Sequence, residues 1–433
     1  MKNYRLLVPL VLIVLFAASF YMLYDAKADV VREYSQYLDT ARAAREDGVD
    51  VKAEKNYMAA LELKPTLELY LEIGDFYQAT GQTKSALAWG ENMLSTYPKE
   101  AAAYEFQIDL LLAEGNYMEC FKLANTLQKR GASSEKVADQ IRTIEYEFYF
   151  SGEFLDVGSF SGGYCPVLTG QKWGYVDSTG TRRIASKFAQ VGVFAGAYAP
   201  VVDLDGTAYF IDVDGNKAFV VTGLGNVTEL GLMSNGIYSA FNGETWSFYD
   251  CEYRLLFGGY EQVSSIGNGV AAVKQQGAWS LLNDQGVDLT GKTYSDVAMD
   301  EKQVVYRNDR LFVNDGSGYQ LIDMSGKVYG TYRFEAVHIF NDSTYAAVMI
   351  DDKWGFVNAS GEMVIEPQYE DARSFSNGFA AVMQDDKWGF IDMSGKMVIE
   401  PQFENAKDFN DHGCVFVIRN TEWELLRLYK YNY

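Results

Sequence analysis

The pattern of hydrophobic and polar positions divides the chain into three parts. Residues Leu6–Tyr24 form a continuously apolar run without charge. From about residue 34 to residue 131, apolar residues recur every three or four positions, which predicts amphipathic helices. Beyond Ile144 apolar and polar residues alternate between frequent Gly and Asn/Asp-Gly pairs, which predicts short strands and tight turns. The pattern therefore predicts three domains: 1–28, 29–144 and 145–433.

The first apolar run has the length and flanks of a membrane anchor. A helix of this length covers roughly the 30 Å hydrocarbon core of a bilayer. Lys2 and Arg5 precede the run and Asp25 follows it, so the positive-inside rule leaves the N-terminus in the cytoplasm and exports the rest. We therefore expect one transmembrane helix at Leu6–Tyr24, in contact with the lipid bilayer. The alternative is a signal peptide cleaved at Ala26–Ala28, which would give a secreted protein.

Glycines and prolines mark a repeat within the helical part. Gly48, Gly81 and Gly115 recur at an interval of about 34 residues, and Pro65 and Pro98 are separated by nearly the same interval. This part resembles the tetratricopeptide repeat (TPR). Three copies carry the residues of its motif: Tyr37, Gly48, Ala53, Tyr57, Ala60 and Pro65; Tyr70, Ile73, Gly74, Tyr77, Gly81, Ala86 and Pro98; and, in a degenerate copy, Tyr104, Leu111, Gly115, Cys120 and Ala124.

The TPR resemblance implies an α-solenoid of stacked helix pairs. Its small residues Gly74 and Ala86 are expected where the two helices of a pair meet. Such arrays commonly present a concave groove to a peptide or to a partner helix. The alternative is a spacer that holds the C-terminal part away from the membrane. The sequence leaves both interpretations open, because three helix pairs are about the minimum for a continuous core.

Tryptophans mark a second repeat in the C-terminal part. Six of them lie at regular positions: Trp173, Trp246, Trp279, Trp354, Trp388 and Trp423. Counted along the chain, their separations are 73, 33, 75, 34 and 35. The two large gaps each span about two units, which places disguised copies around Ala208 and Tyr319. The spacing therefore predicts eight units.

The clearest units share a longer motif. Lys353–Val357 and Lys387–Ile391 read Lys-Trp-Gly-Phe-Val and Lys-Trp-Gly-Phe-Ile, and each is followed by Ser-Gly and by Met-Val-Ile-Glu-Pro-Gln. The copy at Lys172–Asp177 has the same form. These motifs resemble the WG-repeat family of bacterial proteins, although the middle copies replace the glycine by Ser247 or Ser280. The resemblance implies a β repeat that often accompanies helical repeats in exported proteins.

The β repeat predicts a closed ring. Each unit supplies three or four short antiparallel strands, and one such sheet cannot bury both of its faces. The sheets must stack radially as a β-propeller or linearly as a β-solenoid, with each Trp packed against the neighbouring sheet and its Gly allowing close approach. The last unit lacks its final strand. We therefore expect Tyr146–Phe150 to pair antiparallel with Trp423–Leu428 and to close about eight blades, or seven if one degenerate unit forms only a loop.

Composition argues against several classes of function. The 433 residues include 37 Lys and Arg and 59 Asp and Glu, a net charge of −22, which argues against nucleic-acid binding. Two histidines, His338 and His412, are too few to favour a histidine metal site or Ser-His-Asp catalysis. The cysteines are expected to be buried small hydrophobic residues, since none forms a CxxC pair: Cys120, Cys165, Cys251 and Cys414.

Two acidic turns are candidates for a calcium site. Asp203–Gly206 and Asp212–Asn216 alternate oxygen-bearing side chains as a calcium loop does. Both lack the glutamate that completes such a loop, because Asp214 and Gly223 occupy the twelfth positions. Turns that join strands explain the same residues better, so no metal or cofactor is expected.

Recurring carboxylates are candidates for catalytic groups. Four glutamates repeat at two positions of the unit: Glu366, Glu370, Glu400 and Glu404. Repetition predicts structural hydrogen bonds, because a glycoside hydrolase needs one asymmetric carboxylate pair. The segment Ser239–Trp246 approaches the Asp box of sialidase propellers, but Phe241 replaces the aspartate. We therefore predict that the protein is not an enzyme and assign no catalytic residue.

The sequence predicts a membrane-anchored, extracytoplasmic adaptor or scaffold. It would bind a protein or cell-envelope ligand through the TPR and WG repeats, at residues that the sequence does not identify. The alternative is a carbohydrate-active hydrolase or lyase that uses acidic residues on one face of the propeller. An enzyme of this kind needs a pocket with two non-equivalent carboxylates whose pKa values are shifted.

Overall fold

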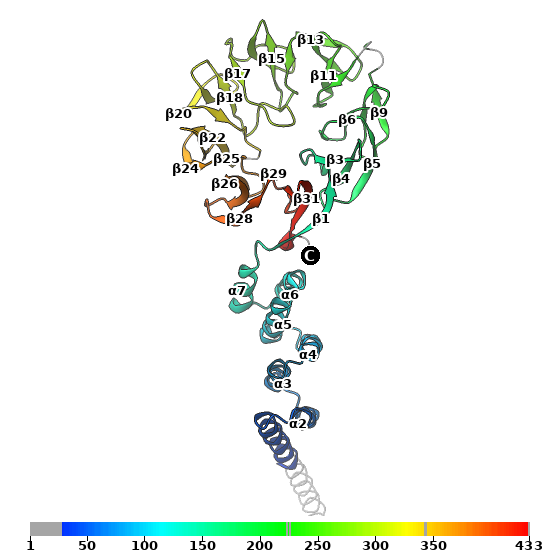
Figure 1. Cartoon of the computed structure of the whole chain (residues 1–433), viewed down its shortest axis with the longest axis vertical. Helices are drawn as coiled ribbons and strands as arrows, with labels where there is room; N and C mark the ends of the chain where they lie inside the picture. The colour runs from blue at the N-terminus through cyan, green and yellow to red at the C-terminus, as the bar shows by residue number, and fades with distance from the viewer. Residues whose placement is uncertain (1–27, 222–223, 225–226, 342–343, 432–433) are drawn as a thin grey trace, which may run out of the picture. The chain divides into compact units, whose positions relative to one another are not determined.

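The computed structural model describes residues 28–221, 224, 227–341 and 344–431. The chain divides between Glu145 and Tyr146 into two compact units, one helical and one built from strands (Figure 1). Residues 28–46 of the helical unit form a helix. Six helices follow it: α2 (Asp50–Leu63), α3 (Leu67–Ala79), α4 (Thr83–Thr96), α5 (Ala101–Ala113), α6 (Tyr117–Lys129) and α7 (Glu135–Thr143).

Glycines lie in the turns after the first helix, α3 and α5. Gly48, Gly81 and Gly115 each have a φ of +70°, a left-handed conformation that glycine adopts without steric penalty. No atom lies within 4 Å of the place where a Cβ would stand at these three positions. Backbone conformation, and not lack of space, therefore selects glycine. The repeat spacing seen in the sequence is the spacing of these turns.

Small residues in the helical unit admit close neighbours. Ala53, Ala60 and Ala86 are fully buried, and consecutive helices from α2 to α7 pack on one another. Gly74 of α3 differs from the expectation. A Cβ at Gly74 would lie 2.4 Å from a ring carbon of Phe106 in α5, so the glycine makes room for α5 and not for the next helix along the chain.

The predicted fold class requires a correction at its N-terminal end. Within the described residues, no helix combines the length and the apolar character needed to span a bilayer. Helices α2 to α7 have 9 to 14 residues, whereas a span needs about 20 apolar residues. The described architecture is therefore a helical unit followed by a β ring, without the predicted transmembrane helix. The segment Leu6–Tyr24, on which that prediction fell, lies outside the described residues.

The described part of the second unit contains eight antiparallel sheets, which we call blades 1 to 8 in chain order. Figure 1 shows them arranged around a common centre. Blades 1 to 4 consist of β2 (Asp156–Val157), β3 (Tyr164–Thr169), β4 (Lys172–Asp177) and β5 (Arg182–Phe188); β6 (Gln190–Val191), β7 (Ala199–Val202), β8 (Ala208–Ile211) and β9 (Lys217–Val220); β10 (Glu229–Leu230), β11 (Ile237–Phe241), β12 (Trp246–Asp250) and β13 (Leu255–Tyr260); and β14 (Gln262–Val263), β15 (Val270–Gln275) and β16 (Ala278–Asn283).

Blades 5 to 8 follow the same plan, with the short strand first and, in blades 6 to 8, the Trp-bearing strand third; in blade 5 the third strand begins with Tyr319. Their strands are β17 (Asp296–Val297), β18 (Leu311–Asn314), β19 (Tyr319–Ile322) and β20 (Val328–Phe334); β21 (Ala336–Val337), β22 (Ala346–Ile350), β23 (Lys353–Val357) and β24 (Met363–Tyr369); β25 (Asp371–Ala372), β26 (Phe379–Gln384), β27 (Lys387–Asp392) and β28 (Met397–Phe403); and β29 (Asn405–Ala406), β30 (Cys414–Arg419), β31 (Glu422–Leu428) and β1 (Phe148–Phe154). The disguised copies are confirmed, because β8 and β19 begin at Ala208 and Tyr319.

The two ends of the ring meet in blade 8. Strand β1 pairs antiparallel with β31, and Phe148 lies opposite Leu428 while Phe154 lies opposite Trp423. The first strand of the unit thus completes its last blade, which removes an exposed sheet edge. The predicted closure into eight blades is confirmed, with pairing that begins at Phe148 instead of Tyr146. The alternatives of a β-solenoid and of seven blades are wrong.

The glycine of the Trp-Gly motif lies beneath a bulge of the outer strand. A Cβ at Gly355 would lie 2.6 Å from the Ile365 carbonyl oxygen and 2.7 Å from the Pro367 nitrogen. Both atoms belong to β24, where the pairing register with β23 shifts. The close approach that glycine permits is therefore within one blade, and not between neighbouring blades as expected.

In blade 3 the two strands approach equally closely, but the glycine lies on the outer strand and the larger residue follows Trp. Ser247 of β12 follows Trp246 as Gly355 follows Trp354, and the residue opposite Ser247 is Gly258 of β13. A Cβ at Gly258 would lie 2.4 Å from the Ser247 Cβ. The pair thus still contains one glycine, now on the outer strand. This exchange explains how blade 3 loses the Trp-Gly motif and keeps its four strands.

Candidate functional site

One loop breaks the repeat of the ring. In every blade a loop connects the short first strand to the second strand. It has six to eight residues in seven blades, whereas in blade 5 it runs from 298 to 310 and is about twice as long. The longer loop carries three consecutive charged residues, Asp300, Glu301 and Lys302. Because its side chains contact blades that are remote in sequence, this insertion is the starting point for a functional site.

Glu301 connects the inserted loop to three other blades. Its carboxylate accepts hydrogen bonds from Lys407 Nζ at 2.8 and 2.9 Å, Arg373 Nη1 at 3.2 Å and Ser159 Oγ at 2.5 Å. Burial alone would raise the pKa of Glu301, but the Lys407 charge and the hydrogen bonds from Lys407 and Ser159 lower this pKa to about 2. Glu301 is therefore ionised and firmly held.

Two buried polar atoms of charged groups beside Glu301 have no such partners. Arg373 Nε and Asp408 Oδ1 are buried and donate or accept no hydrogen bond within the described residues. Burial raises the pKa of Asp408 despite the nearby Arg373. Burial lowers the pKa of Lys302, and repulsion from Arg307 adds to this effect. Both shifts follow because burial penalises the charged form of each group.

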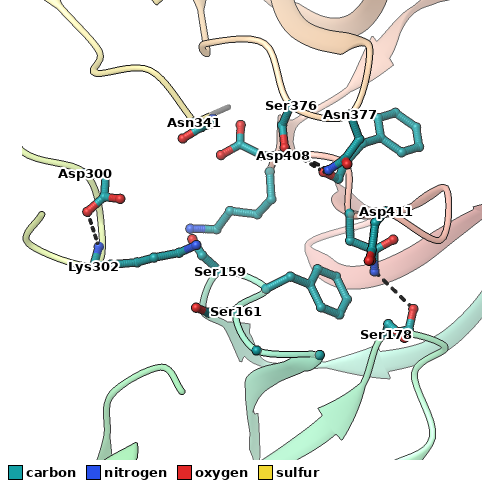
Figure 2. A pocket seen from close by; sticks show the side chains of 16 residues that line it. Ser159, Ser161, Ser178, Asp300, Lys302, Asn341, Ser376, Asn377, Asp408 and Asp411 are labelled. Carbon is teal, nitrogen blue, oxygen red and sulfur yellow. Dashed lines mark hydrogen bonds between the residues drawn. The ribbon is translucent and has the colours of Figure 1, made fainter. Parts of the chain in front are cut away.

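Lys302, Lys407 and Asp408 line a cavity of about 350 Å³ at the inner loops. Figure 2 shows Lys302 extending into the cavity from the loop of blade 5, while Asp408 enters it from blade 8. The volume is within the range of small-molecule sites. The lining is mostly polar and comes from blades 1, 5, 6, 7 and 8: Ser159, Phe160, Ser161, Gly162, Gly163, Ser178, Asp300, Lys302, Asn341, Ser376, Asn377, Lys407, Asp408, Phe409, Asn410 and Asp411.

Lys302 also borders two further cavities. One, of about 270 Å³, is lined by Trp173, Trp246 and Glu301 among others. The second, of about 570 Å³, lies along the loops of blades 1 to 4 and includes Cys251. Within the described part of the chain, no side-chain hydrogen bond or ion pair engages the Lys302 ammonium group. Lys302 is therefore placed where three cavities meet.

The acidic turns proposed from the sequence are structural. Asp212 Oδ1 accepts hydrogen bonds from the backbone N–H groups of Asp214 and Asn216 at 3.0 and 2.8 Å. The same arrangement caps one turn in each of seven blades: Asp177, Asp212, Asp250, Asn283, Asp323, Asn358 and Asp392. Among the residues that the structure describes, no three His, Cys, Asp or Glu side chains gather to hold a metal ion. The turns thus use their carboxylates as caps.

The recurring glutamates also take structural positions. Glu370 Oε2 accepts a hydrogen bond from the Asp386 N–H at 3.0 Å, which holds the turn between β26 and β27. This contact confirms the predicted structural hydrogen bond for Glu370. The other repeated glutamates, Glu366, Glu400 and Glu404, are exposed. Ser239 of the damaged Asp box is buried in β11, opposite Phe248 of β12. It therefore belongs to the blade and not to a cavity.

Sequence reasoning missed the central group of charges. Ser159, Glu301, Arg373 and Lys407 lie in four blades and form no local motif. One signal was available in the Trp spacing. The two units between Trp279 and Trp354 are together longer, by six positions, than the two units between Trp354 and Trp423. This excess corresponds to the inserted loop.

Comparison with known proteins identifies the repeat but not the whole chain. No curated protein matches the chain. Among solved structures similar to it, BamB from Moraxella catarrhalis shares 12% identity with a TM-score of 0.43, and the match covers 65% of this chain and 99% of that chain. A eukaryotic initiation factor shares 13% identity (TM-score 0.42, 66% of this chain and 86% of that chain), and the AfRom2 CNH domain shares 10% identity (TM-score 0.33, 56% of this chain and 94% of that chain). The family described as WG containing repeat matches residues 354–388 and 388–423, which supports the WG-repeat resemblance for these units.

Proposed function

We propose that this protein is a non-catalytic adaptor that takes its ligand at the centre of the ring. One observation carries the proposal: Lys302 and Asp408 line the same cavity. Asp408 Oδ1 is buried without a hydrogen-bond partner, and no hydrogen bond engages the half-buried Lys302 ammonium group within the described residues. Burying such groups without partners costs free energy. A fold that retains both in a cavity of about 350 Å³ offers them to the charged groups of a ligand.

The position of these groups supports the same proposal. The turn caps and the glycines beside Trp recur around the ring, as expected for residues that maintain the blades. The group around Glu301 occurs once and depends on an insertion in a single blade. The packing of the blades does not account for a loop that occurs in one blade only, so the unique loop is a better candidate for a functional site than any repeated position.

Two further features belong to the proposal. The resemblance of residues 29–144 to TPR supports an α-solenoid that acts as a second binding surface or as a spacer. Lys2 and Arg5 before the apolar run support export of the remaining chain. Protease added to intact cells should then degrade residues 29–433, and complete protection of the chain would contradict the exported location.

Capture of the ligand tests the adaptor. The full chain, with a photo-crosslinking residue at Asn341, is expressed in its native cells and its adducts are identified. We expect adducts with the wild-type cavity and their loss in Lys302→Met and Asp408→Asn. Lys387→Met is the matched control, because Lys387 is an exposed lysine in the Lys-Trp-Gly segment of blade 7. Adducts that persist unchanged in both central variants would contradict a ligand at this cavity.

A glycan hydrolase is the second candidate, and one observation favours it. Glu301 and Asp408 are non-equivalent carboxylates near one cavity, with pKa values shifted in opposite directions, as acid–base pairs require. Against this, Lys407, Arg373 and Ser159 occupy both oxygens of Glu301. Release of reducing sugar from envelope glycan, abolished by Asp408→Asn, would establish the hydrolase and refute the non-catalytic adaptor.

A further inference from the structure

Most tryptophans of the ring are covered by a basic side chain or by an imidazole. Arg373 lies 5.8 Å from the centre of the Trp388 ring, and Lys407 lies 5.6 Å from that of Trp423. In blade 6 the imidazole of His338 stacks on Trp354 at 5.0 Å. Trp279 of blade 4 is covered by Lys274, whose Nζ is 5.7 Å from the ring centre. These four tryptophans are 5 to 8% exposed.

Trp173 and Trp246 have no such cover within the described residues. Both are half-buried and line the cavity of about 270 Å³. The covering side chains of blades 6 to 8 come from the residue that directly follows the short first strand. In blades 1 and 3 that residue is glycine, Gly158 or Gly231. The two tryptophan rings are therefore open to the cavity because their blades lack the covering side chain.

The backbone shows that these positions are equivalent. The Gly158 N–H donates to the Pro166 carbonyl at 2.9 Å, as the Arg373 N–H donates to the Ala381 carbonyl at 2.9 Å. A Cβ at Gly158 would lie 3.0 Å from Pro166 Cγ, so the proline of the second strand is linked to the glycine. Blade 1 thus has Gly158 and Pro166 where blade 7 has Arg373 and Ala381. The absence of a side chain at Gly158 leaves room over Trp173.

We propose that this cavity binds an arginine or lysine side chain of a partner protein, which covers Trp173 and Trp246 as the chain's own basic residues cover Trp388 and Trp423. The inference rests on the proposed adaptor function and names the chemistry of its partner. Positively charged groups are attracted to the faces of tryptophan rings, and arginine is favoured because its planar guanidinium stacks and is weakly hydrated.

Charge complementarity supports a basic partner. Glu229, Glu301 and Lys302 line the cavity. Because Glu301 is already paired with Arg373 and Lys407, Glu229 is the acidic group that remains available to a basic ligand. Glu301 already binds the two covering groups of blades 7 and 8, Arg373 and Lys407, so a carboxylate beside a covered tryptophan is a feature that this ring uses twice. The chain as a whole carries a net charge of −22, which attracts basic partners over a distance.

The first experiment measures binding of a basic probe to the full chain. Fluorescein-labelled Gly-Arg-Gly-Arg-Gly is titrated and followed by anisotropy, beside the same peptide with Gln for Arg. We expect preference for the Arg peptide and a loss of affinity of about fivefold in Trp173→Leu and in Trp246→Leu. Glu229→Gln should also weaken binding, whereas Glu244→Gln should not. Glu244 is an exposed glutamate of the same blade and changes net charge equally.

A second variant installs the missing cover. Gly158→Arg combined with Pro166→Ala copies the Arg373 and Ala381 pair of blade 7. The introduced guanidinium should lie over Trp173 and reduce binding of the Arg peptide about fivefold or more. Unfolding of the ring at the wild-type temperature shows that the fold is kept. Undiminished peptide binding by this folded variant would overturn the proposal.

The outcomes separate this inference from the adaptor function. Equal binding of the Arg and Gln peptides would overturn the inference and identify the two tryptophans as a platform for a neutral ligand. If native cells still yield the adducts while the Arg peptide does not bind, the adaptor stands and the basic partner is wrong. If the Arg peptide binds as predicted and no adduct forms in cells, the cavity assignment stands and the adaptor function is wrong.

Discussion

Gly355→Ala is expected to destabilise the ring through one methyl group. The added Cβ would lie 2.6 Å from the Ile365 carbonyl oxygen and 2.7 Å from the Pro367 nitrogen, whereas ordinary contacts begin at 3.4 Å. Both neighbours are backbone atoms, so no side-chain rotation relieves the contact. The φ of Gly355 is outside the left-handed region, so alanine meets no conformational strain there. The whole cost therefore comes from displacing the outer strand β24.

The size of the effect follows from these contacts. Overpacking of a well-packed site costs about 1–3 kcal/mol, and the reduced freedom of alanine in the unfolded chain offsets about 0.4–1 kcal/mol. We expect a net loss of about 1–2 kcal/mol, which lowers the Tm of a unit of this size by about 2–6 °C. Tryptophan fluorescence reports the transition, because six of the seven tryptophans lie in the ring.

Blade 3 supplies the control for this reasoning. Ser247 already carries a Cβ at the equivalent position, so Ser247→Ala should change stability by less than about 0.5 kcal/mol. Gly258→Ala should destabilise blade 3, and adding Ser247→Gly should recover part of the loss, since the Ser247 Cα at 2.9 Å remains close. If Gly355→Ala had the Tm of the wild-type protein, or if adding Ser247→Gly to Gly258→Ala recovered no stability, contact between the strands would not be what selects glycine.

Three further predictions address the ring and its centre. Trp388→Ala should cost roughly 3–5 kcal/mol through the cavity it leaves, measured by urea unfolding; an unchanged midpoint would contradict a packing role. Deleting residues 420–433 should lower the Tm of the whole ring, because β1 then loses its partner; a frayed edge with an unchanged main transition would contradict ring closure. Glu301, whose pKa is lowered to about 2, stabilises the fold above its unfolded pKa of about 4.3 and loses this contribution as pH falls toward 2. Glu301→Gln should therefore flatten the fall in stability between pH 5 and pH 3, and an unchanged slope would show that Glu301 does not contribute.

The ring was largely predictable because its information is repeated. Each blade must bury the same faces, so the regular recurrence of Trp fixes the length of the unit even where single copies are degenerate. Closure was predictable because the last unit ends after Trp423–Leu428 without an outer strand, and the segment near Phe148 supplies that fourth strand. In both cases several residues point to the same structure, and the loss of one does not change the conclusion.

The centre could not be predicted in the same way. Glu301 and Lys407 are far apart in the sequence, and their contact depends on how far the inserted loop 298–310 reaches once the ring has closed. No period or local propensity records that distance. The exchange of Ser247 and Gly258 was equally hidden, because it appears only when the register of β12 and β13 is known.

Repetition also separates residues that maintain the ring from residues that are free to change. A turn cap such as Asp323 or a glycine such as Gly355 meets the same backbone geometry in several blades, so the fold itself accounts for it. The residue after the short first strand varies together with the residue that faces it on the second strand, such as Pro166 opposite Gly158. It is a basic residue or His338 in blades 6 to 8, where it covers a tryptophan, and glycine in blades 1 to 3.

Three departures from the repeat lie close together in the ring. The uncovered Trp173 and Trp246, the inserted loop 298–310 and the unpartnered Lys302 all border one cavity of about 270 Å³. These three come from blades 1, 3 and 5, which are not consecutive in the sequence, and only the closed ring brings them to the same place. For this reason the cavity is the place to seek the partner.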